Sequence, residues 1–337
     1  MVKARKYVVK KYFKGLPKRD DFEIVEYELP PLKDGQFIVK AEWISVDPYL
    51  RAYNPFNAIP YDQFSFQIGN VVESKHADFP VGCKVVSHMG WCDYCLIDEK
   101  ILKDESNKVY KLPDMGLPTE LGVGALGMHG ITAYFGFLEI CKPNSGETVV
   151  VTGAAGAVGS IVGQIAKIKG CRVIGFVGSD EKVEWLEKEL GFDKAINYKS
   201  KDLSKALKEV APNGVDCLFE NVGGELSATI MSQMNKGGRV ALCGCISIYN
   251  HDASERPKTT SVLPYIVARE LKVEGFHVRN WYSPVNRWPE AITALVGWIK
   301  TGKIQARSHV TEGFDKLFDA FIGLLNGENI GKAVVKV

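Results

Sequence analysis

Short apolar runs alternate with longer amphipathic segments in the middle of the chain. The runs are rich in β-branched residues, as buried parallel strands are, and they cover residues 147–153, 171–179, 194–198, 215–224 and 239–244. The segments 160–170 and 180–190 have helical periodicity; Ser179 and Asp180 open the second, and Gly191 closes it. This alternation predicts a doubly wound parallel sheet of at least four strands between Glu147 and Gly244.

The first part of the chain has a different pattern. Its β-rich runs, divided by Pro, Gly and Asp turns, are 6–12, 23–30, 36–46, 69–74 and 83–97. The last residues, 329–337, also form a strand pattern after a helical one. We therefore expect a β-rich barrel-like domain made of residues 1–122 and 305–337, and a parallel-sheet domain made of 123–304.

A glycine-rich turn joins the first apolar run to its helix, with the sequence Ala154-x-Gly156-x-x-Gly159. Small residues there let the turn close, let backbone N–H groups approach a phosphate, and let the helix pack on its strand. The N-terminus of that helix then faces the anion. Because the turn lies between a strand and a helix, it predicts a Rossmann dinucleotide site.

The end of the second run indicates which dinucleotide is bound. Proteins selective for NAD place an acid there on the ribose 2′-hydroxyl, but this run ends in Gly178 and Ser179. Lys182 follows in the first helical turn, where its ammonium could pair with a 2′-phosphate or simply be solvated. Asp180 and Glu181 also suit a helix N-terminus. The pattern favours NADP over NAD.

Composition is that of a large globular enzyme, with 337 residues and a net charge of +2 that offers no basic footprint for nucleic acid. The first residues lack the apolar core of a secretion signal, and we expect a cytoplasmic protein.

Of the eight cysteines, only Cys83, Cys92 and Cys95, with His88, have spacing that could hold zinc. Their alternating apolar pattern favours paired strands instead, so no metal is expected.

Several motifs taken together resemble a known family. They are ISVDPYLR (44–51), VTGAAGAVGS (151–160), GFDKAINY (191–198), NVGGE (221–225), CGCISIYN (243–250) and NIGKAVVKV (329–337). Across nearly the whole chain they are similar to the zinc-independent medium-chain dehydrogenase/reductases, in the branch of prostaglandin reductases and alkenal double-bond reductases. The resemblance implies a Rossmann doubly wound sheet with a β-rich GroES-like barrel domain, acting as a homodimer.

The activity that the resemblance implies is NADPH-dependent reduction of the carbon–carbon double bond in α,β-unsaturated ketones and aldehydes, with hydride added to the β-carbon. The substrates implied are 15-oxoprostaglandins or lipid-derived alkenals, and NADP-linked oxidation of a leukotriene hydroxyl is a related activity. VDPY stands where zinc alcohol dehydrogenases place a catalytic cysteine, so hydrogen-bond donors must stabilise the enolate. Tyr249 and a ribose hydroxyl are the implied donors, or Tyr249 only positions the cofactor.

The resemblance also implies a set of binding residues. Tyr49 would contact the substrate, with Asp47 and Arg51 flanking it and Pro48 fixing the turn, unless it is only a buried turn residue. Asn221 and Asn329 have plain turn and cap roles as alternatives. The implied cofactor contacts are Gly156, Ala157, Val158, Gly159, Lys182, Tyr198, Asn221, Cys243, Gly244, Cys245, Ile246, Ser247, Ile248, Tyr249, Phe276, His277, Val278 and Asn329.

Two other functions are compatible with these features. A quinone reductase shares the NADPH fold without zinc, and an NADPH-binding structural protein could retain it without catalysis; the VDPYLR and ISIYN motifs disfavour both. Glu220 stands where relatives of this branch commonly have Asp, and the segment 251–271 offers no residue that can be assigned to a pocket. Aromatic residues that could line a lipid-sized pocket, but are more often core, are Phe56, Phe64, Trp91, Tyr265 and Trp281.

Overall fold

The computed structural model describes residues 2–200, 202–252, 254–282 and 285–337. The chain divides into two compact units. Unit 1 contains residues 1–124, 308–329 and 333–337, and unit 2 contains residues 125–307 and 330–332. Each unit is described by itself.

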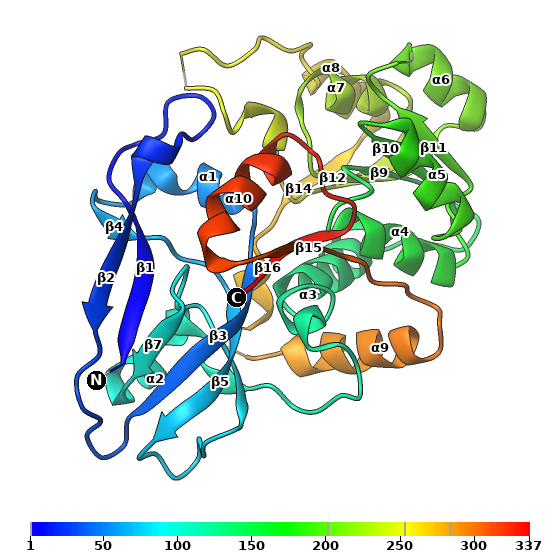
Figure 1. Cartoon of the computed structure of the whole chain (residues 1–337). Coiled ribbons are helices and arrows are strands. Elements are labelled where there is room, and N and C mark those ends of the chain that lie inside the picture. Colours follow the sequence, from blue (N-terminus) through cyan, green and yellow to red (C-terminus); the bar gives the residue numbers. More distant parts are fainter. Residues whose placement is uncertain (1, 201, 253, 283–284) are drawn as a thin grey trace. The chain divides into compact units, whose positions relative to one another are not determined.

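Unit 2 is built on a six-stranded parallel sheet (Figure 1). The strand order is β11-β10-β9-β12-β13-β14. The central strands are buried along most of their length because their Val, Ile and Phe side chains meet helices on both faces of the sheet. The strand bounds are β9 (Thr148–Thr152), β10 (Arg172–Val177), β11 (Lys194–Asn197), β12 (Val215–Glu220), β13 (Met234–Leu242) and β14 (Lys272–Gly275).

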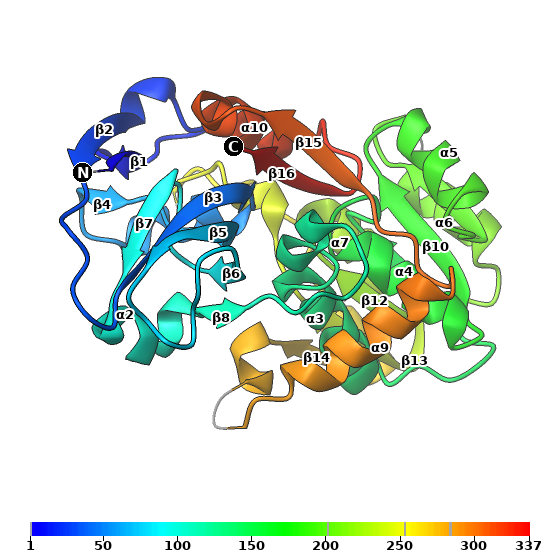
Figure 2. The same cartoon turned by 60° about the horizontal axis from the view of Figure 1, so that its bottom comes forward.

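Helices cover both faces of this sheet. Helix α4 contacts β9 and β10, and α5 contacts β10 and β11; α7 contacts β12, and α8 contacts β13. Helices α3, α4 and α9 lie side by side (Figures 1 and 2). The bounds are α3 (Met128–Phe135), α4 (Gly159–Ile168), α5 (Asp180–Lys188), α6 (Leu203–Val210), α7 (Gly224–Ser232), α8 (Leu263–Arg269) and α9 (Trp288–Lys300), with short turns η5 (Gly136–Cys141), η6 (Ile246–Ile248) and η7 (Val278–Trp281).

Unit 1 contains two β-sheets. A three-stranded sheet has the order β2-β1-β4, and a seven-stranded sheet has the path β15-β16-β3-β5-β6-β8, with β7 also paired to β3. The strands are β1 (Lys3–Val9), β2 (Phe22–Glu28), β3 (Phe37–Ser45), β4 (Tyr61–Asp62), β5 (Gln67–Ser74), β6 (Lys84–Ser87), β7 (Tyr94–Ile97), β8 (Tyr110–Lys111), β15 (Ser308–Glu312) and β16 (Lys332–Lys336). The helical segments are α1 (Tyr49–Ala52), α2 (Glu99–Lys103), α10 (Leu317–Leu325), η1 (Arg19–Asp21), η2 (Asn54–Phe56), η3 (Glu105–Asn107), η4 (Thr119–Val123) and η8 (Phe314–Lys316).

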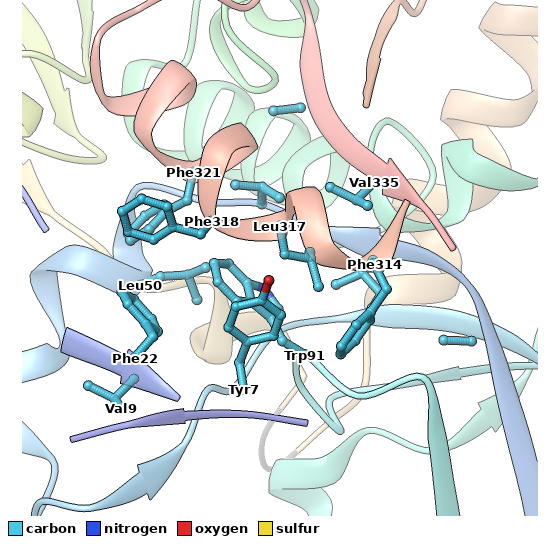
Figure 3. Packing of buried hydrophobic residues seen from close by; sticks show 14 of the residues in the cluster. Tyr7, Val9, Phe22, Leu50, Trp91, Phe314, Leu317, Phe318, Phe321 and Val335 are labelled. Carbon is cyan, nitrogen blue, oxygen red and sulfur yellow. The ribbon is translucent and has the colours of Figure 1, made fainter. Parts of the chain in front are cut away.

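An aromatic core joins the two ends of the chain within unit 1 (Figure 3). The Trp91 ring lies 5.3 Å from the ring of Tyr7 in an edge contact and 5.8 Å from the ring of Phe321 on α10. Phe318, one turn earlier on α10, meets Phe22 at 5.6 Å. Burial of these large rings stabilises the return of the C-terminal segment to the β-rich unit.

The predicted fold class is confirmed: a parallel Rossmann sheet with a separate β-rich unit. Ser179 caps α5 as predicted, because its side chain accepts a hydrogen bond from the Lys182 N–H. Within the described ranges, no helix is both long enough and apolar enough to span a membrane.

Candidate active site

The sheet of unit 2 reverses its winding between β9 and β12. From β9 the chain moves outward to β10 and β11, then crosses back to β12 on the other side. Ligands of open α/β sheets bind outside the carboxyl ends of the strands at such a point. The predicted cofactor residues of unit 2 follow these carboxyl ends: 156–159 after β9, Lys182 after β10, Tyr198 after β11, Asn221 after β12, 243–249 after β13 and 276–278 after β14.

The glycine-rich turn has the close packing that a phosphate-binding turn needs. Gly153 has a φ of +57°, which favours glycine. A Cβ on Gly159 would lie 2.5 Å from the Gly153 oxygen and 2.9 Å from the Ala154 Cα, so only glycine lets α4 start this close to β9. At the start of α4, the N–H groups of Ser160, Ile161 and Val162 donate to the oxygens of Gly156 and Val158, so the turn and the helix form one compact unit. The positive end of the helix dipole lies at this turn. The turn is braced from outside by Gly331, whose N–H donates to the Ala155 oxygen at 2.8 Å.

A hydrogen-bonded brace ties β9 to β12 beside this turn. The Thr152 hydroxyl donates to Glu220 Oε1 at 2.6 Å and accepts from the Asn221 N–H at 2.8 Å. The Asn221 amide donates to the Thr152 carbonyl at 2.7 Å. Glu220 Oε1 also accepts from the N–H groups of Val222 and Gly223. Asn221 is therefore more than a plain turn residue, since it links two strand ends.

Glu220, to which the sequence analysis gave no role, holds the ends of several strands together through hydrogen bonds. Its side chain is 1% exposed, and its backbone oxygen accepts from the N–H groups of Cys243 and Gly244. Glu220 thus connects the ends of β9, β12 and β13. The signal in the sequence was an acid at the end of an apolar strand, where burial requires hydrogen-bond partners.

Two lysines and a tyrosine gather over the end of β10. A Cβ on Gly178 would lie 3.0 Å from Tyr198 Oη and 3.4 Å from Lys199 Cε. Burial lowers the pKa of Lys182, and the charge of Lys199 lowers it further. Two ammonium groups near one phenol suit an anion with several oxygens.

Lys199 is a residue that the sequence analysis missed. It lies in the polar run that follows β11, where a lysine is normally solvated. Only the parallel pairing of β10 with β11 brings it beside Gly178 and Lys182. The Asp180 carboxylate, which could have contacted a ribose, instead accepts a hydrogen bond from the Asn197 amide at 2.9 Å. Lys182, Lys199 and the Tyr198 phenol thus lie together at the end of β10, and the charge of Glu181 also acts on Lys182.

Tyr249 lies at the end of η6 in the loop after β13. Its hydroxyl oxygen accepts a hydrogen bond from the backbone N–H of Cys245 at 3.3 Å. A Cβ on Gly244 would approach the same oxygen to 3.1 Å, so glycine leaves room for the phenol. The loop is fixed to β12 because the N–H groups of Ile246 and Ser247 donate to the oxygens of Asn221 and Val222. A phenol that accepts an N–H bond is polarised toward donating its own proton.

Cys243, Cys245 and Phe276 follow the carboxyl ends of β13 and β14, and their side chains are partly or largely buried. Burial raises the pKa of the Cys243 thiol to about 12, and it also raises that of Cys245. Both side chains therefore line the loop as neutral thiols. The Phe276 ring is half-buried and packs 6.0 Å from Phe219 and 5.5 Å from Trp281. The His277 Nδ1 accepts from the Arg279 N–H at 3.2 Å.

In unit 1, Tyr49 opens α1 directly after Pro48. Its ring stacks on Phe64 with centroids 6.0 Å apart. The hydroxyl oxygen is buried, and the Ser65 side chain is its polar neighbour. Burial raises the pKa of this phenol well above its ordinary value, and the charge of Asp47 raises it further.

The neighbours of Tyr49 have different roles. The Ser45 hydroxyl donates to Asp47 at 2.5 Å within the same turn. The Arg51 guanidinium donates to the backbone oxygens of Gly15 and Phe13. Arg51 therefore anchors the turn to the loop after β1. Asn329 is 8% exposed and belongs to unit 1, one residue before the stretch 330–332 that joins unit 2.

The cysteines that could have held zinc share an apolar cluster. Cys92 and Cys95 are buried there among Phe37, Val71 and Val85, and Cys83 packs against the same group. The His88 ring lies 4.6 Å from the ring of Phe66. Among the residues with described positions, no three His, Cys, Asp or Glu side chains gather as metal ligands.

Comparison with known proteins agrees with this geometry. A family model described as an N-terminal domain of oxidoreductases matches residues 5–104, and one described as a zinc-binding dehydrogenase matches 157–297. Prostaglandin reductase 1 from Bos taurus is 48% identical, with all of both chains covered. A 2-alkenal reductase (NADP(+)-dependent) from Nicotiana tabacum is 36% identical over 100% of this chain and 98% of its own.

A solved structure adds the cofactor. CurA from Vibrio vulnificus, in complex with NADPH, superimposes with a TM-score of 0.89 at 34% identity, covering 99% of each chain. The motifs, the fold and these relatives together establish that the chain belongs to the medium-chain dehydrogenase/reductase family, in the branch of prostaglandin reductases and alkenal reductases.

Proposed function

We propose that this protein reduces the carbon–carbon double bond of α,β-unsaturated ketones and aldehydes with NADPH. The observation that carries the proposal is the Tyr249 phenol, held by the Cys245 N–H in a loop at the same sheet edge as the dinucleotide turn. A hydrogen-bond donor at that edge is what a metal-free reduction of an enone needs, because negative charge develops on the carbonyl oxygen. The activities named for the relatives from cattle and tobacco support the same reaction.

The residues of unit 2 fit NADPH. The start of α4 would hold the pyrophosphate, and Lys182, Lys199 and Tyr198 would hold the 2′-phosphate beside Gly178. Asn221 and the stretch 243–249 would position the nicotinamide half, since the brace to Thr152 fixes both. When bound, NADPH supplies the hydride for the β-carbon.

The chain's own contribution to the reaction is positioning and charge stabilisation. The Tyr249 hydroxyl would donate a hydrogen bond to the substrate oxygen as charge develops there, with the Cys245 N–H polarising the phenol. The Cys243 and Cys245 thiols stay protonated at neutral pH and bring no second negative charge to the loop. Loss of hydrogen-bond stabilisation of this kind typically costs about two to three orders of magnitude in turnover.

Tyr49 is the proposed substrate contact on unit 1. Its hydroxyl is buried beside the Ser65 side chain without a well-formed hydrogen bond, and a poorly satisfied buried polar group is costly. A carbonyl or hydroxyl of the substrate would satisfy it. The stacked Phe64 ring fixes the orientation of the phenol.

The proposed substrates are enones and enals derived from lipids, namely 15-oxoprostaglandins and long-chain alkenals. The support is the family branch, together with the 48% identity to a prostaglandin reductase. A quinone reductase is the competing enzymatic function, and a panel that includes a quinone separates the two.

The proposed assembly is a homodimer. Strand β14 is the last strand of the parallel sheet, and Lys272, Glu274 and Gly275 along it are exposed. An edge strand of this kind can pair with a second copy. Light scattering on the purified protein tests the dimer.

The proposed location is the cytoplasm, supported by eight cysteines that all remain free thiols.

The experiment that tests the function compares several oxidants under one set of conditions. NADPH consumption would be followed with 2-nonenal, a 15-oxoprostaglandin and a quinone, and each assay repeated with NADH. We expect saturated aldehyde and ketone products and a strong preference for NADPH. Turnover of the quinone alone would replace the proposal with a quinone reductase, and no turnover at all would favour a binding protein.

A further inference from the structure

Three aromatic rings follow one another along the turn that begins at Tyr49. Tyr49, Tyr53 and Phe56 are spaced i, i+4 and i+7, which places them on one face of the continuous helical segment formed by α1 and η2. The ring centroids of Tyr49 and Tyr53 are 6.0 Å apart, and those of Tyr53 and Phe56 are 6.4 Å apart. The three rings form a row that we call the aromatic row.

Exposure rises along the aromatic row. The Tyr49 hydroxyl is buried, Tyr53 is 40% exposed, and Phe56 is 82% exposed. Two of the other aromatic residues that the sequence offered for a lipid pocket are core residues, since Trp91 is 1% exposed and Trp281 is 7% exposed. Phe56 is thus set apart from these two core aromatics as a large apolar side chain presented to solvent.

The segment that presents Phe56 is held firmly. The Asn54 side chain is fully buried; it accepts from the Phe13 N–H at 2.8 Å and donates to the Tyr61 hydroxyl at 2.9 Å. The Asn57 amide donates to the Tyr53 oxygen at 2.7 Å. A row of rings held by satisfied polar groups is preorganised, which lowers the entropic cost of binding an apolar ligand.

The lack of charged side chains and the length of the aromatic row favour an uncharged, extended ligand. Residues 52–61 contain no charged side chain. The row spans at most roughly 12 Å, the length of an extended alkyl chain of about eight to ten carbon–carbon bonds. Aromatic faces bury alkyl groups without needing hydrogen bonds.

We propose that the aromatic row of Tyr49, Tyr53 and Phe56 binds the alkyl chain of the substrate, with the chain terminus over Phe56. This inference rests on the proposed function and names the part of the substrate that sets its length preference. A protein with such a row discriminates between enals by chain length, because long chains reach Phe56 and short ones do not.

The test measures the Michaelis constant for acrolein, 2-hexenal and 2-nonenal in the wild type and in Phe56→Ala. We expect the KM for 2-nonenal to rise about five- to ten-fold in the variant, and that for acrolein to change less than about two-fold, because only the long chain reaches the ring. Phe56→Leu should retain most of the preference. Val81→Ala, which shortens another exposed apolar side chain of unit 1, is the matched control and should match the wild type.

A second measurement is independent of turnover. Calorimetric titration with 1-nonanol reports binding of the chain alone, and Phe56→Ala should weaken it by a similar factor. If 1-nonanol and 2-nonenal bind equally well to both proteins, the inference is wrong even though enal reduction stands. If no enal is reduced but nonanol binding still depends on Phe56, the proposed function fails and the apolar site remains. A change of oligomeric state in Phe56→Ala without a change in nonanol binding would identify a contact between copies and overturn the inference.

Discussion

The hydroxyl oxygen of Tyr249 lies 3.3 Å from the backbone nitrogen of Cys245 and accepts a hydrogen bond from it. The phenol is therefore oriented by the main chain of its own loop, which the N–H groups of Ile246 and Ser247 tie to the end of β12. An oriented donor needs little reorganisation when charge develops on a substrate oxygen.

Replacement of Tyr249 by Phe removes the proposed donor and keeps the ring. We expect turnover with 2-nonenal to fall about 100- to 1,000-fold, while the dissociation constant for NADPH changes less than about three-fold. Steady-state kinetics and calorimetric titration with NADPH measure the two quantities. Tyr12→Phe removes a hydroxyl from an exposed tyrosine in unit 1 and should change neither. Unaltered turnover in Tyr249→Phe would leave the phenol a positioning role only.

The pair of lysines over the end of β10 predicts a defect confined to the phosphorylated cofactor. In Lys182→Ala we expect the KM for NADPH to rise about 10- to 100-fold and that for NADH to stay within about two-fold, because a charge-assisted bond to the 2′-phosphate is lost. Lys199→Ala should act in the same direction. Lys188→Ala, at the exposed end of the same helix α5, is the control. Equal losses for NADPH and NADH would argue that the lysines hold the fold and no phosphate.

Two glycines in helices predict opposite effects of the same substitution. Gly159→Ala places a Cβ 2.5 Å from the Gly153 oxygen, so we expect lost NADPH binding and a lower thermal midpoint. Gly297, inside α9, has no atom within 4 Å of its Cβ position, and Gly297→Ala should stabilise the protein by about 0.5–1 kcal/mol. Thermal unfolding and calorimetry check both. A Gly159→Ala protein that binds NADPH normally would contradict the described turn.

Burial of His88 predicts a stability loss in mild acid. Burial lowers its pKa to about 4, and the negative charge of Asp47 acts in the opposite direction. Because the unfolded chain binds a proton near pH 6.5 and the folded chain does not, stability falls as the pH drops from about 6.5 to about 4. At pH 5 the loss relative to pH 7 should be about 2 kcal/mol.

The measurement compares the free energy of unfolding at pH 7 and pH 5 in the wild type and in His88→Gln. The variant should lose the His88 part of this pH dependence, and His309→Gln, which alters an exposed histidine, should keep it. Identical pH profiles for the wild type and His88→Gln would show that His88 is protonated as readily in the folded chain as in the unfolded one.

The parallel sheet was predictable because its signals are local. Each strand from β9 to β12 is a short apolar run bounded by turn residues, and Ser179 caps the start of α5. The predicted end of this helix was wrong, because α5 ends at Lys188 with Glu189 as its C-cap, and Gly191, with a φ of +71°, lies in the turn that follows. Strand β13 begins at Met234, five residues before the run predicted from Arg239, because Met234 pairs with Val215 of β12 ahead of a register shift. Regular pairing with β12 and β14 starts at Arg239, where the apolar pattern also starts.

The contacts that depend on distant pairing could not be read from the sequence. Lys199 reaches the cofactor corner only because β10 pairs with β11, and Glu220 becomes a hub only because β9, β12 and β13 end together. The exposure of Phe56 against the burial of Trp91 likewise depends on how the C-terminal helix α10 covers unit 1, where Phe321 meets the Trp91 ring. Residue type alone did not distinguish these two aromatics.

The fate of the cofactor's hydrogen tests the proposed reaction most directly. The protein would be incubated with NADPH carrying deuterium at the transferable position and with 2-nonenal, and the product analysed by mass spectrometry and NMR. The account predicts nonanal with one deuterium on the β-carbon. Deuterium at the aldehyde carbon with the double bond retained, as in an allylic alcohol, or no transfer at all, would contradict it.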